Sequence, residues 1–250
     1  RNYELDNNPS DEWFMRALLL GTDTFKEPIN IGAEGEMLKE YIRNPLFHPG
    51  WRIWENFTVT CLYETAGDLT VSNITRHVND GYGLVNYAGH GNPDGWWLWS
   101  WEPEGFYSKW DALSQTNGWK LPMVFAMACT TSRFSDRESI GEAFMLNPNG
   151  GAIAYFGSTR VASSNPYLFM IQGFAAEMDW RFSKAFFSGN NFPGKVWAQA
   201  VTEYVLAHPP DTLTPLVNPL GLWYINWKTT AEYGSPFADP TTTIGGLPET

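Results

Sequence analysis

Two short apolar runs, each ending in a reactive side chain, constrain the fold of this chain more than any other feature. The first covers residues 83–88 and breaks into a Gly-His-Gly triplet around His90, and the second covers residues 121–128 and breaks at Cys129. A short apolar run bounded by turn residues is typical of a buried strand in a parallel sheet. Because ligands bind beyond the carboxyl ends of such strands, the two side chains form a candidate catalytic dyad.

The rest of the chain alternates strands with helices, which predicts a mostly parallel α/β sheet covered on both faces. Residues 92–105 are expected to form a long loop, and residues 222–227 a late strand. Further strands are predicted at residues 14–20, 57–63 and 151–156, and helices at residues 34–43, 69–78, 107–113, 138–146, 166–187 and 194–207.

With 250 residues, the chain favours one large domain over two small ones. We assign residues 1–12 to an N-terminal connector, residues 13–228 to the domain, and residues 229–250 to a C-terminal tail that could include a last edge strand. Since the chain lacks an initiator Met and a signal peptide, we expect a mature or excised piece of something longer.

The net charge of −11 argues against a nucleic-acid partner or an anionic membrane surface, because both attract basic proteins. The apolar runs fall far short of the ~20 residues that span a bilayer, so no membrane span is expected. The chain has four histidines and two cysteines. Among them, His90 alone is bracketed by glycines at a strand end, and Cys61 fits a buried, inert thiol in the strand at 57–63. Structural roles for His90 and Cys129, in a turn and in the core, remain open alternatives.

Tryptophans crowd the loop after His90, with Trp96 and Trp97 nearest to it. Aromatic side chains at this density form either a binding surface or part of the core. The loop could therefore wall a substrate cleft, or pack over the edge of the sheet. His, Cys, Asp and Glu show no metal-ligand spacing, so we predict no metal site and no required cofactor.

Four segments, read together, resemble gingipain-type cysteine peptidases, a family of clan CD. The two apolar runs, as residues 83–91 and 128–134, are similar to the family's signature strands, and residues 139–144 and 150–159 agree in order and spacing. The resemblance covers about residues 12–160. It implies a caspase-like three-layer α/β/α sandwich and a secreted or surface-attached endopeptidase that acts on protein or peptide substrates. The resemblance also implies a preceding half of the catalytic region, so a missing N-terminal segment of the same precursor is a candidate partner. Structural calcium, known in the family, would fit the acidic composition.

The resemblance also implies a mechanism of acyl transfer. Cys129 would attack the scissile carbonyl, and His90 would assist it and then protonate the leaving amine. The backbone amides of Cys129 and Gly91 would form the oxyanion hole. An acid near the end of the first strand supports the histidine in this family, and Asp23 has that place here, although a turn-capping Asp is an equal alternative.

For substrate binding, the resemblance places an acid at the start of the following helix, where it holds a basic P1 residue. Glu36 is the first candidate and Glu34 the second, although an acid in a helix's first turn is favourable without any substrate. Ser158, at the end of a later strand, belongs to the implied substrate-binding set. Two alternatives stay open: a transpeptidase or sorting enzyme of the same fold, and a non-catalytic module that binds glycans or proteins through the Trp-rich loop.

Overall fold

The computed structural model describes residues 12–25, 32–44, 46–48, 57–99, 105–165, 171–190, 192–209 and 222–242. The expected N-terminal connector lies outside these residues, except for position 12, where a short 3₁₀ helix begins (η1, Glu12–Met15). None of the helices in the described parts of the chain is long and apolar enough to cross a membrane.

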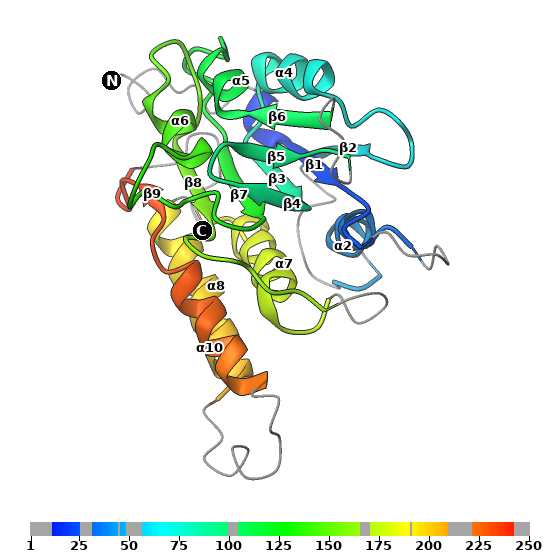
Figure 1. Ribbon diagram of the computed structural model, residues 1–250, viewed down its shortest axis with the longest axis vertical. Helices are drawn as coiled ribbons and strands as arrows, with labels where there is room; N and C mark the ends of the chain where they lie inside the picture. The colour runs from blue at the N-terminus through cyan, green and yellow to red at the C-terminus, as the bar shows by residue number, and fades with distance from the viewer. Residues whose placement is uncertain are drawn as a thin grey trace.

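A six-stranded sheet forms the centre of the molecule, with the order β2-β1-β3-β7-β8-β9 (Figure 1). Its first five strands are parallel, and β9 pairs antiparallel with β8. The five strands predicted at residues 14–20, 57–63, 83–88, 121–128 and 151–156 are confirmed to within a few residues. The strands are β1 (Arg16–Gly21), β2 (Thr58–Tyr63), β3 (Leu84–Ala88), β7 (Met123–Met127), β8 (Ala154–Gly157) and β9 (Phe237–Ala238).

Helices cover both faces of this sheet, as the strand–helix alternation predicts. Successive strand residues point to opposite faces, so Leu19 packs with one group of helices while Leu18 and Leu20 pack with the other. Figure 1 shows the sheet running between the two groups. One group contains α2 (Glu34–Arg43), α7 (Phe174–Phe187), α8 (Pro193–Ala207) and α10 (Leu222–Glu232), and the other contains α4 (Val71–Asp80), α5 (Lys109–Leu113) and α6 (Ile140–Leu146).

A second, three-stranded sheet corrects the expected loop at residues 92–105. Its antiparallel strands are β4 (His90–Asn92), β5 (Gly95–Trp97) and β6 (Phe106–Ser108). The hairpin between β4 and β5 forms because the Asn92 side chain accepts hydrogen bonds from the amides of Asp94 and Gly95, at 2.8 and 3.1 Å. Such a side-chain turn allows two very short strands to pair, which the apolar pattern alone does not reveal.

The predicted strand at residues 222–227 is also wrong, because these residues begin helix α10. A short apolar run fits a strand and a helix equally well. Here the helix continues to Glu232, which forms an ion pair with Lys228 one turn earlier (3.0 Å). The proposed boundary after residue 228 therefore falls inside a helix, and strand β9 comes from the tail beyond it.

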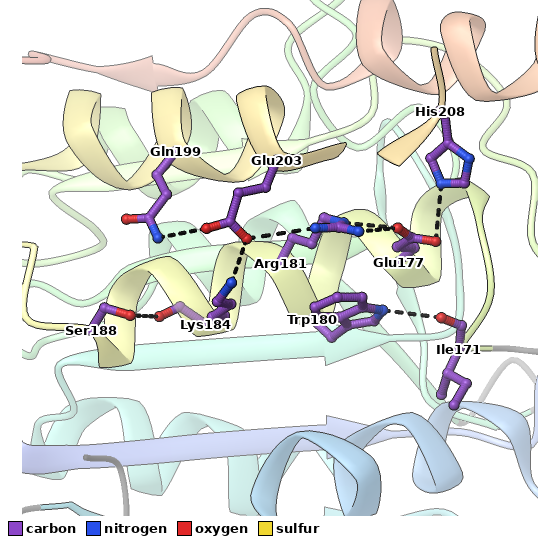
Figure 2. Close-up of polar contacts among 9 residues, drawn as sticks. All are labelled: Ile171, Glu177, Trp180, Arg181, Lys184, Ser188, Gln199, Glu203 and His208. Atoms are coloured by element: carbon purple, nitrogen blue, oxygen red, sulfur yellow. Dashed lines mark hydrogen bonds and ion pairs between the residues drawn. The ribbon is translucent and has the colours of Figure 1, made fainter. Parts of the chain in front are cut away.

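A line of polar contacts joins helices α7 and α8 (Figure 2). Glu203 on α8 binds Lys184 and Arg181 on α7, at 2.7 and 3.5 Å. Arg181 also binds Glu177 on its own helix at 2.6 Å. The other oxygen of Glu177 contacts His208, just after α8, at 3.1 Å, and accepts the backbone N–H of residue 173 at 2.6 Å. Charged contacts thus fix the start of α7, which bears on the site described next.

Candidate active site

His90 and Cys129 occupy equivalent positions on neighbouring strands. Strands β3 and β7 pair in parallel with Ala88 opposite Met127, and each candidate residue comes two positions after one member of this pair. Both side chains line one pocket at the carboxyl ends of the strands. The structure thus brings together the two residues on which the sequence argument rests.

The imidazole of His90 is oriented by a backbone carbonyl. Its Nε2 lies 2.6 Å from the carbonyl oxygen of Thr24, in the turn after β1. Because a carbonyl can only accept, Nε2 carries the proton, and the neutral ring has its lone pair on Nδ1. The ring of Phe25 stands edge-on to the imidazole, with 6.4 Å between centroids. This tautomer makes Nδ1 the atom that can act as a base.

The thiol of Cys129 is partly buried and donates to the carbonyl oxygen of Ala162 at 3.6 Å. Burial raises the pKa of this thiol above its usual value, so its neutral form is favoured. The next residue, Thr130, has a φ of 54°, a conformation that a β-branched side chain rarely adopts. Its amide donates to the carbonyl of Arg160 at 2.8 Å, which ties the turn after β7 to the turn after β8.

The pocket has a volume of about 90 Å³, and its lining comes from five separate stretches of the chain. Most of the lining side chains are small or apolar, and two are serines from the segment after β8. The lining residues are Thr24, Phe25, Gly89, His90, Met127, Ala128, Cys129, Ala162, Ser163, Ser164 and Ala175.

Gly91 directly follows His90 in β4 and lies in tight contact with the turn that carries the cysteine. A Cβ atom at this position would come within 2.8 Å of both the Ala128 Cβ and the Thr131 Cγ2. Close packing alone therefore explains why this residue has no side chain. The roles of the Gly91 and Cys129 amides as oxyanion donors stay predictions.

Asp23, the expected support for the histidine, lies directly beside Thr24 in the turn after β1. Its amide donates to the Glu64 carboxylate at 2.9 Å. The neighbouring Thr24 carbonyl lies 2.6 Å from Nε2 of the imidazole. The role of Asp23 in supporting the histidine stays a prediction. Sequence reasoning missed Thr24, and no residue pattern could have signalled it, because every residue type carries a carbonyl.

The two candidate acids for substrate binding have other contacts. Glu36 accepts hydrogen bonds from the amide and the hydroxyl of Thr65, at 2.8 and 2.7 Å, in the turn after β2. Partial burial raises the pKa of Glu36, while the two bonds from Thr65 oppose this shift. Glu34 is fully buried and accepts the amide of Phe25 at 3.1 Å. Neither acid lines the pocket, although Phe25 does.

Two further residues that were expected to contact the substrate are Ser158 and Trp97. Ser158 is fully buried, where its hydroxyl donates to the Arg160 carbonyl at 2.8 Å and shapes the turn after β8. Trp97 is half-buried and its ring lies against Phe106, with 4.7 Å between centroids. Neither of these two side chains lines the pocket.

Trp96 belongs to the core, which corrects its assignment to substrate binding. Its side chain is 0% exposed. The ring stacks on Tyr87 with a centroid distance of 4.8 Å and an interplanar angle of 9°. Its Nε1 donates to the hydroxyl of Tyr155 at 3.1 Å. A side chain without accessible surface cannot contact a substrate or a glycan.

Among the described residues, no group of three or more His, Cys, Asp and Glu side chains could hold a metal ion. The candidate site combines an imidazole, a thiol and backbone groups at neighbouring strand ends, within a three-layer α/β/α fold. This combination is typical of caspase-like proteins. The chain belongs to peptidase family C25, whose family model matches residues 1–243.

Solved structures agree with this assignment at the level of the fold. The crystal structure of the Arg-specific cysteine proteinase gingipain R (RgpB) is 19% identical, with a TM-score of 0.68 over 98% of this chain and 51% of that one. The complex of the RgpB pro- and mature domains from Porphyromonas gingivalis is 19% identical, with a TM-score of 0.66 over 96% and 50%. A third structure, described as a protease, is 16% identical, with a TM-score of 0.62 over 97% and 52%.

The chain therefore spans about half the length of these structures. No curated protein sequence matches it significantly.

Proposed function

We propose that this chain carries the catalytic dyad of a cysteine endopeptidase, with Cys129 as nucleophile and His90 as general base and acid. The observation that carries the proposal is the pairing of Ala88 with Met127, which puts both residues at one level beyond adjacent strands and in one pocket. Membership of peptidase family C25 supports the same reaction class.

In the proposed reaction, Nδ1 of His90 takes the proton of Cys129 as Sγ bonds to the scissile carbonyl carbon. Because burial keeps the thiol neutral, this proton transfer accompanies the attack. The imidazolium then forms with its Nε2–H still bonded to the Thr24 carbonyl, which stabilises the new charge. It gives the Nδ1 proton to the leaving amine, and the C–N bond breaks to leave a thioester. Water then attacks the thioester carbon as His90 takes one of its protons. The C–S bond breaks, the acid is released, and His90 returns the proton to Sγ of Cys129.

The developing oxyanion needs hydrogen-bond donors near Sγ. We assign this role to the amides of Cys129 and Gly91, because Gly91 packs directly against the turn that carries the nucleophile. Asp23, beside Thr24, would act on the histidine through the same turn. Transfer of the acyl group to an amine instead of water would need no change in these residues, but nothing in the pocket favours it. The burial of Trp96 disfavours a binding module that uses the Trp-rich loop.

Partners and location are part of the proposal as well. RgpB has been solved as a complex of its pro- and mature domains. By analogy, we propose that a segment of the same precursor pairs with this chain, and that the protein acts outside the cell or at its surface on protein or peptide substrates. Structural calcium remains a proposal based on the family resemblance and the acidic composition alone.

The proposal is tested by mass spectrometry after reaction with peptidyl electrophiles that carry a range of P1 residues. We expect a label on Cys129, and a labelling rate at least ~100-fold lower for His90→Ala, because positioned general bases contribute factors of this size. The matched controls are His77→Ala on helix α4 and Cys61→Ala on strand β2, which should label at the rate of the unchanged protein. An equal labelling rate without His90, or no label on a folded protein, would contradict the dyad.

A further inference from the structure

We propose that Lys228 and Glu232 on helix α10 are positioning residues for Cys129, and that they act through the backbone of residues 159–162. The inference rests on the proposed function, because it concerns how the nucleophile is held. Neither residue belongs to the proposed dyad or lines its pocket. Helix α10 lies beside α8 (Figure 1) and far from Cys129 in the sequence, so its link to the thiol depends on the tertiary fold.

The first argument is that one short segment, residues 159–162 after β8, holds the nucleophile by two backbone carbonyls. The Arg160 carbonyl accepts the amide of Thr130 at 2.8 Å, and the Ala162 carbonyl accepts the Cys129 thiol at 3.6 Å. Thr130 directly follows the nucleophile and has a φ of 54°, a strained conformation that persists only when its surroundings hold it. The position of the thiol therefore depends on where this segment lies.

The second argument is that α10 holds the alternate residues of the same segment. The amide and the hydroxyl of Thr159 donate to the Glu232 carbonyl, at 3.0 and 3.2 Å. The ammonium of Lys228 donates to the Val161 carbonyl at 3.3 Å. These two residues of the segment alternate with the two that contact the turn of the nucleophile. The segment is thus a backbone bridge between helix α10 and the candidate active site.

The third argument is that the end of α10 is anchored to the strand that leads to Cys129. Tyr233 directly follows the helix, and its ring stacks on Phe125 of β7 with a centroid distance of 5.4 Å and an interplanar angle of 7°. Its hydroxyl donates to the carbonyl of Ala126, on the same strand, at 3.5 Å. The helix and the nucleophile therefore share one support, which fixes the base from which the segment is held.

The ion pair between Lys228 and Glu232 keeps the ammonium in place. Their charged groups lie 3.0 Å apart, and the side chains are 36% and 2% exposed, respectively. A buried carboxylate is costly unless a cation stays beside it, so Glu232 restrains Lys228. Burial raises the pKa of Glu232, and the contact with Lys228 opposes this shift. The ammonium thus contacts the Val161 carbonyl from a restrained position.

The two charges also act on the thiol, in opposite directions. Burial is the main cause of the raised pKa of Cys129; Glu232 adds to this shift, and Lys228 opposes it. In the described parts of the chain, the titratable groups that also face the thiol are His90, Tyr87 and Tyr233. Burial raises the pKa of both tyrosines, so they stay neutral. The protonation of the thiol therefore reports on the charge of Glu232.

Lys228→Met tests the positioning, because it removes the donor to Val161 and keeps a side chain of similar length. We expect the maximum rate at which a peptidyl electrophile labels Cys129 to fall at least ~10-fold, with the half-saturating concentration unchanged within about 2-fold, since a displaced reacting atom slows chemistry more than binding. Lys228→Arg keeps a charged donor and should restore most of the rate. Lys195→Met makes the same change at an exposed position on α8 and should leave the rate unchanged. If Lys228→Met does not fold, the double variant Lys228→Met, Glu232→Gln makes the same comparison without a buried charge.

Glu232→Gln tests the charge, because it keeps an oxygen that can accept from Lys228 and removes the negative charge. We expect the pH profile of Cys129 alkylation by iodoacetamide, followed at that cysteine by mass spectrometry, to shift to lower pH, since losing a nearby negative charge favours the thiolate. Glu138→Gln, in the exposed loop before α6, should leave the profile in place. A merely structural role of Glu232 would not move the profile either.

Three outcomes would overturn the inference. They are a labelling rate of folded Lys228→Met equal to that of Lys195→Met, a loss that is equally large in Lys228→Arg, and an unshifted profile for Glu232→Gln. The proposed function fails separately, if a peptidyl electrophile labels Cys129 equally fast with and without His90. The alkylation profile is independent of that result, because iodoacetamide reacts with a thiolate without help from a dyad.

Discussion

Thr130 and Phe174 are the two residues other than glycine, within the described parts of the chain, that have a positive φ. Thr130 is the β-branched one, for which this conformation is least favourable. Its φ of 54° follows directly after the candidate nucleophile, and its amide is bound to the Arg160 carbonyl. An L-residue in this conformation is strained, and strain of this kind is often found where a turn must present a reactive group. The turn directs Cys129 out of the sheet and toward Ala162. The sequence gives no sign of this, because Thr is an ordinary residue for a loop.

Replacing this threonine should therefore stabilise the protein, against the usual direction of a substitution next to an active site. Asn adopts the left-handed region more readily than Thr, so we expect Thr130→Asn to raise the free energy of unfolding by about 1 kcal/mol. Urea denaturation measures this change. Thr116→Asn, at an exposed position with ordinary φ, should gain nothing. A loss of stability at position 130 larger than that of the control would show that the turn is not strained.

At the scale of elements, a fully buried polar network locks two helices onto the strand that leads to His90. Lys39 on α2 binds Asp179 on α7 and Asn86 on β3, both at 2.6 Å. Asn86 in turn donates to Asp179 and Ser183, at 2.6 and 2.9 Å. Burial lowers the pKa of Lys39 and raises the pKa of Asp179, while their contact opposes both shifts. Asn86 interrupts an apolar run, which marks it as unusual, but its partners lie 47 and 93 positions away and cannot be found by periodicity.

Breaking this network on one side should be costly. Lys39→Met leaves the Asp179 carboxylate buried without its cation, so we expect a loss of about 3–5 kcal/mol in the free energy of unfolding. The double variant Lys39→Met, Asp179→Leu should recover most of that loss, because no uncompensated charge remains. Arg43→Met removes an exposed partner of Glu40 from the same helix and should cost about 1 kcal/mol or less. A single variant as stable as this control would contradict a charged pair.

At the scale of the whole molecule, much of the architecture follows from apolar periodicity. The five parallel strands and the helices over both faces were predictable, because each is a local pattern bounded by turn residues. The second sheet and helix α10 were not, since one depends on a side-chain turn at Asn92 and the other on an ambiguous apolar run. His90 and Cys129 were predictable as site residues, because each follows the carboxyl end of an apolar strand. The Thr24 carbonyl and the wall at residues 162–164 were not, because only the tertiary fold brings them to the pocket.

Trp96 links the second sheet to the core of the whole domain, and its replacement tests this placement. We expect Trp96→Ala to lower the free energy of unfolding by about 3–5 kcal/mol, as for other large-to-small changes in cores. Trp110→Ala removes the same side chain from an exposed site and should change stability by roughly 0.5 kcal/mol or less. Circular dichroism during urea denaturation distinguishes the two. If Trp96→Ala raised KM for peptides and left stability unchanged, the residue would be a substrate contact after all.

The backbone hydrogen bonds of the sheet continue past the strand ends into the pocket. The amide of Thr22 donates to the Ala88 carbonyl, that of Gly89 to the Met127 carbonyl, and that of Ser132 to the Ser158 carbonyl. These bonds hold the turns in place without any particular side chain. Selection can therefore rewrite the side chains at residues 162–164 while the dyad keeps its geometry. Related proteins could therefore differ in substrate preference through a few substitutions in this one loop, while the arrangement of the strand ends stays the same.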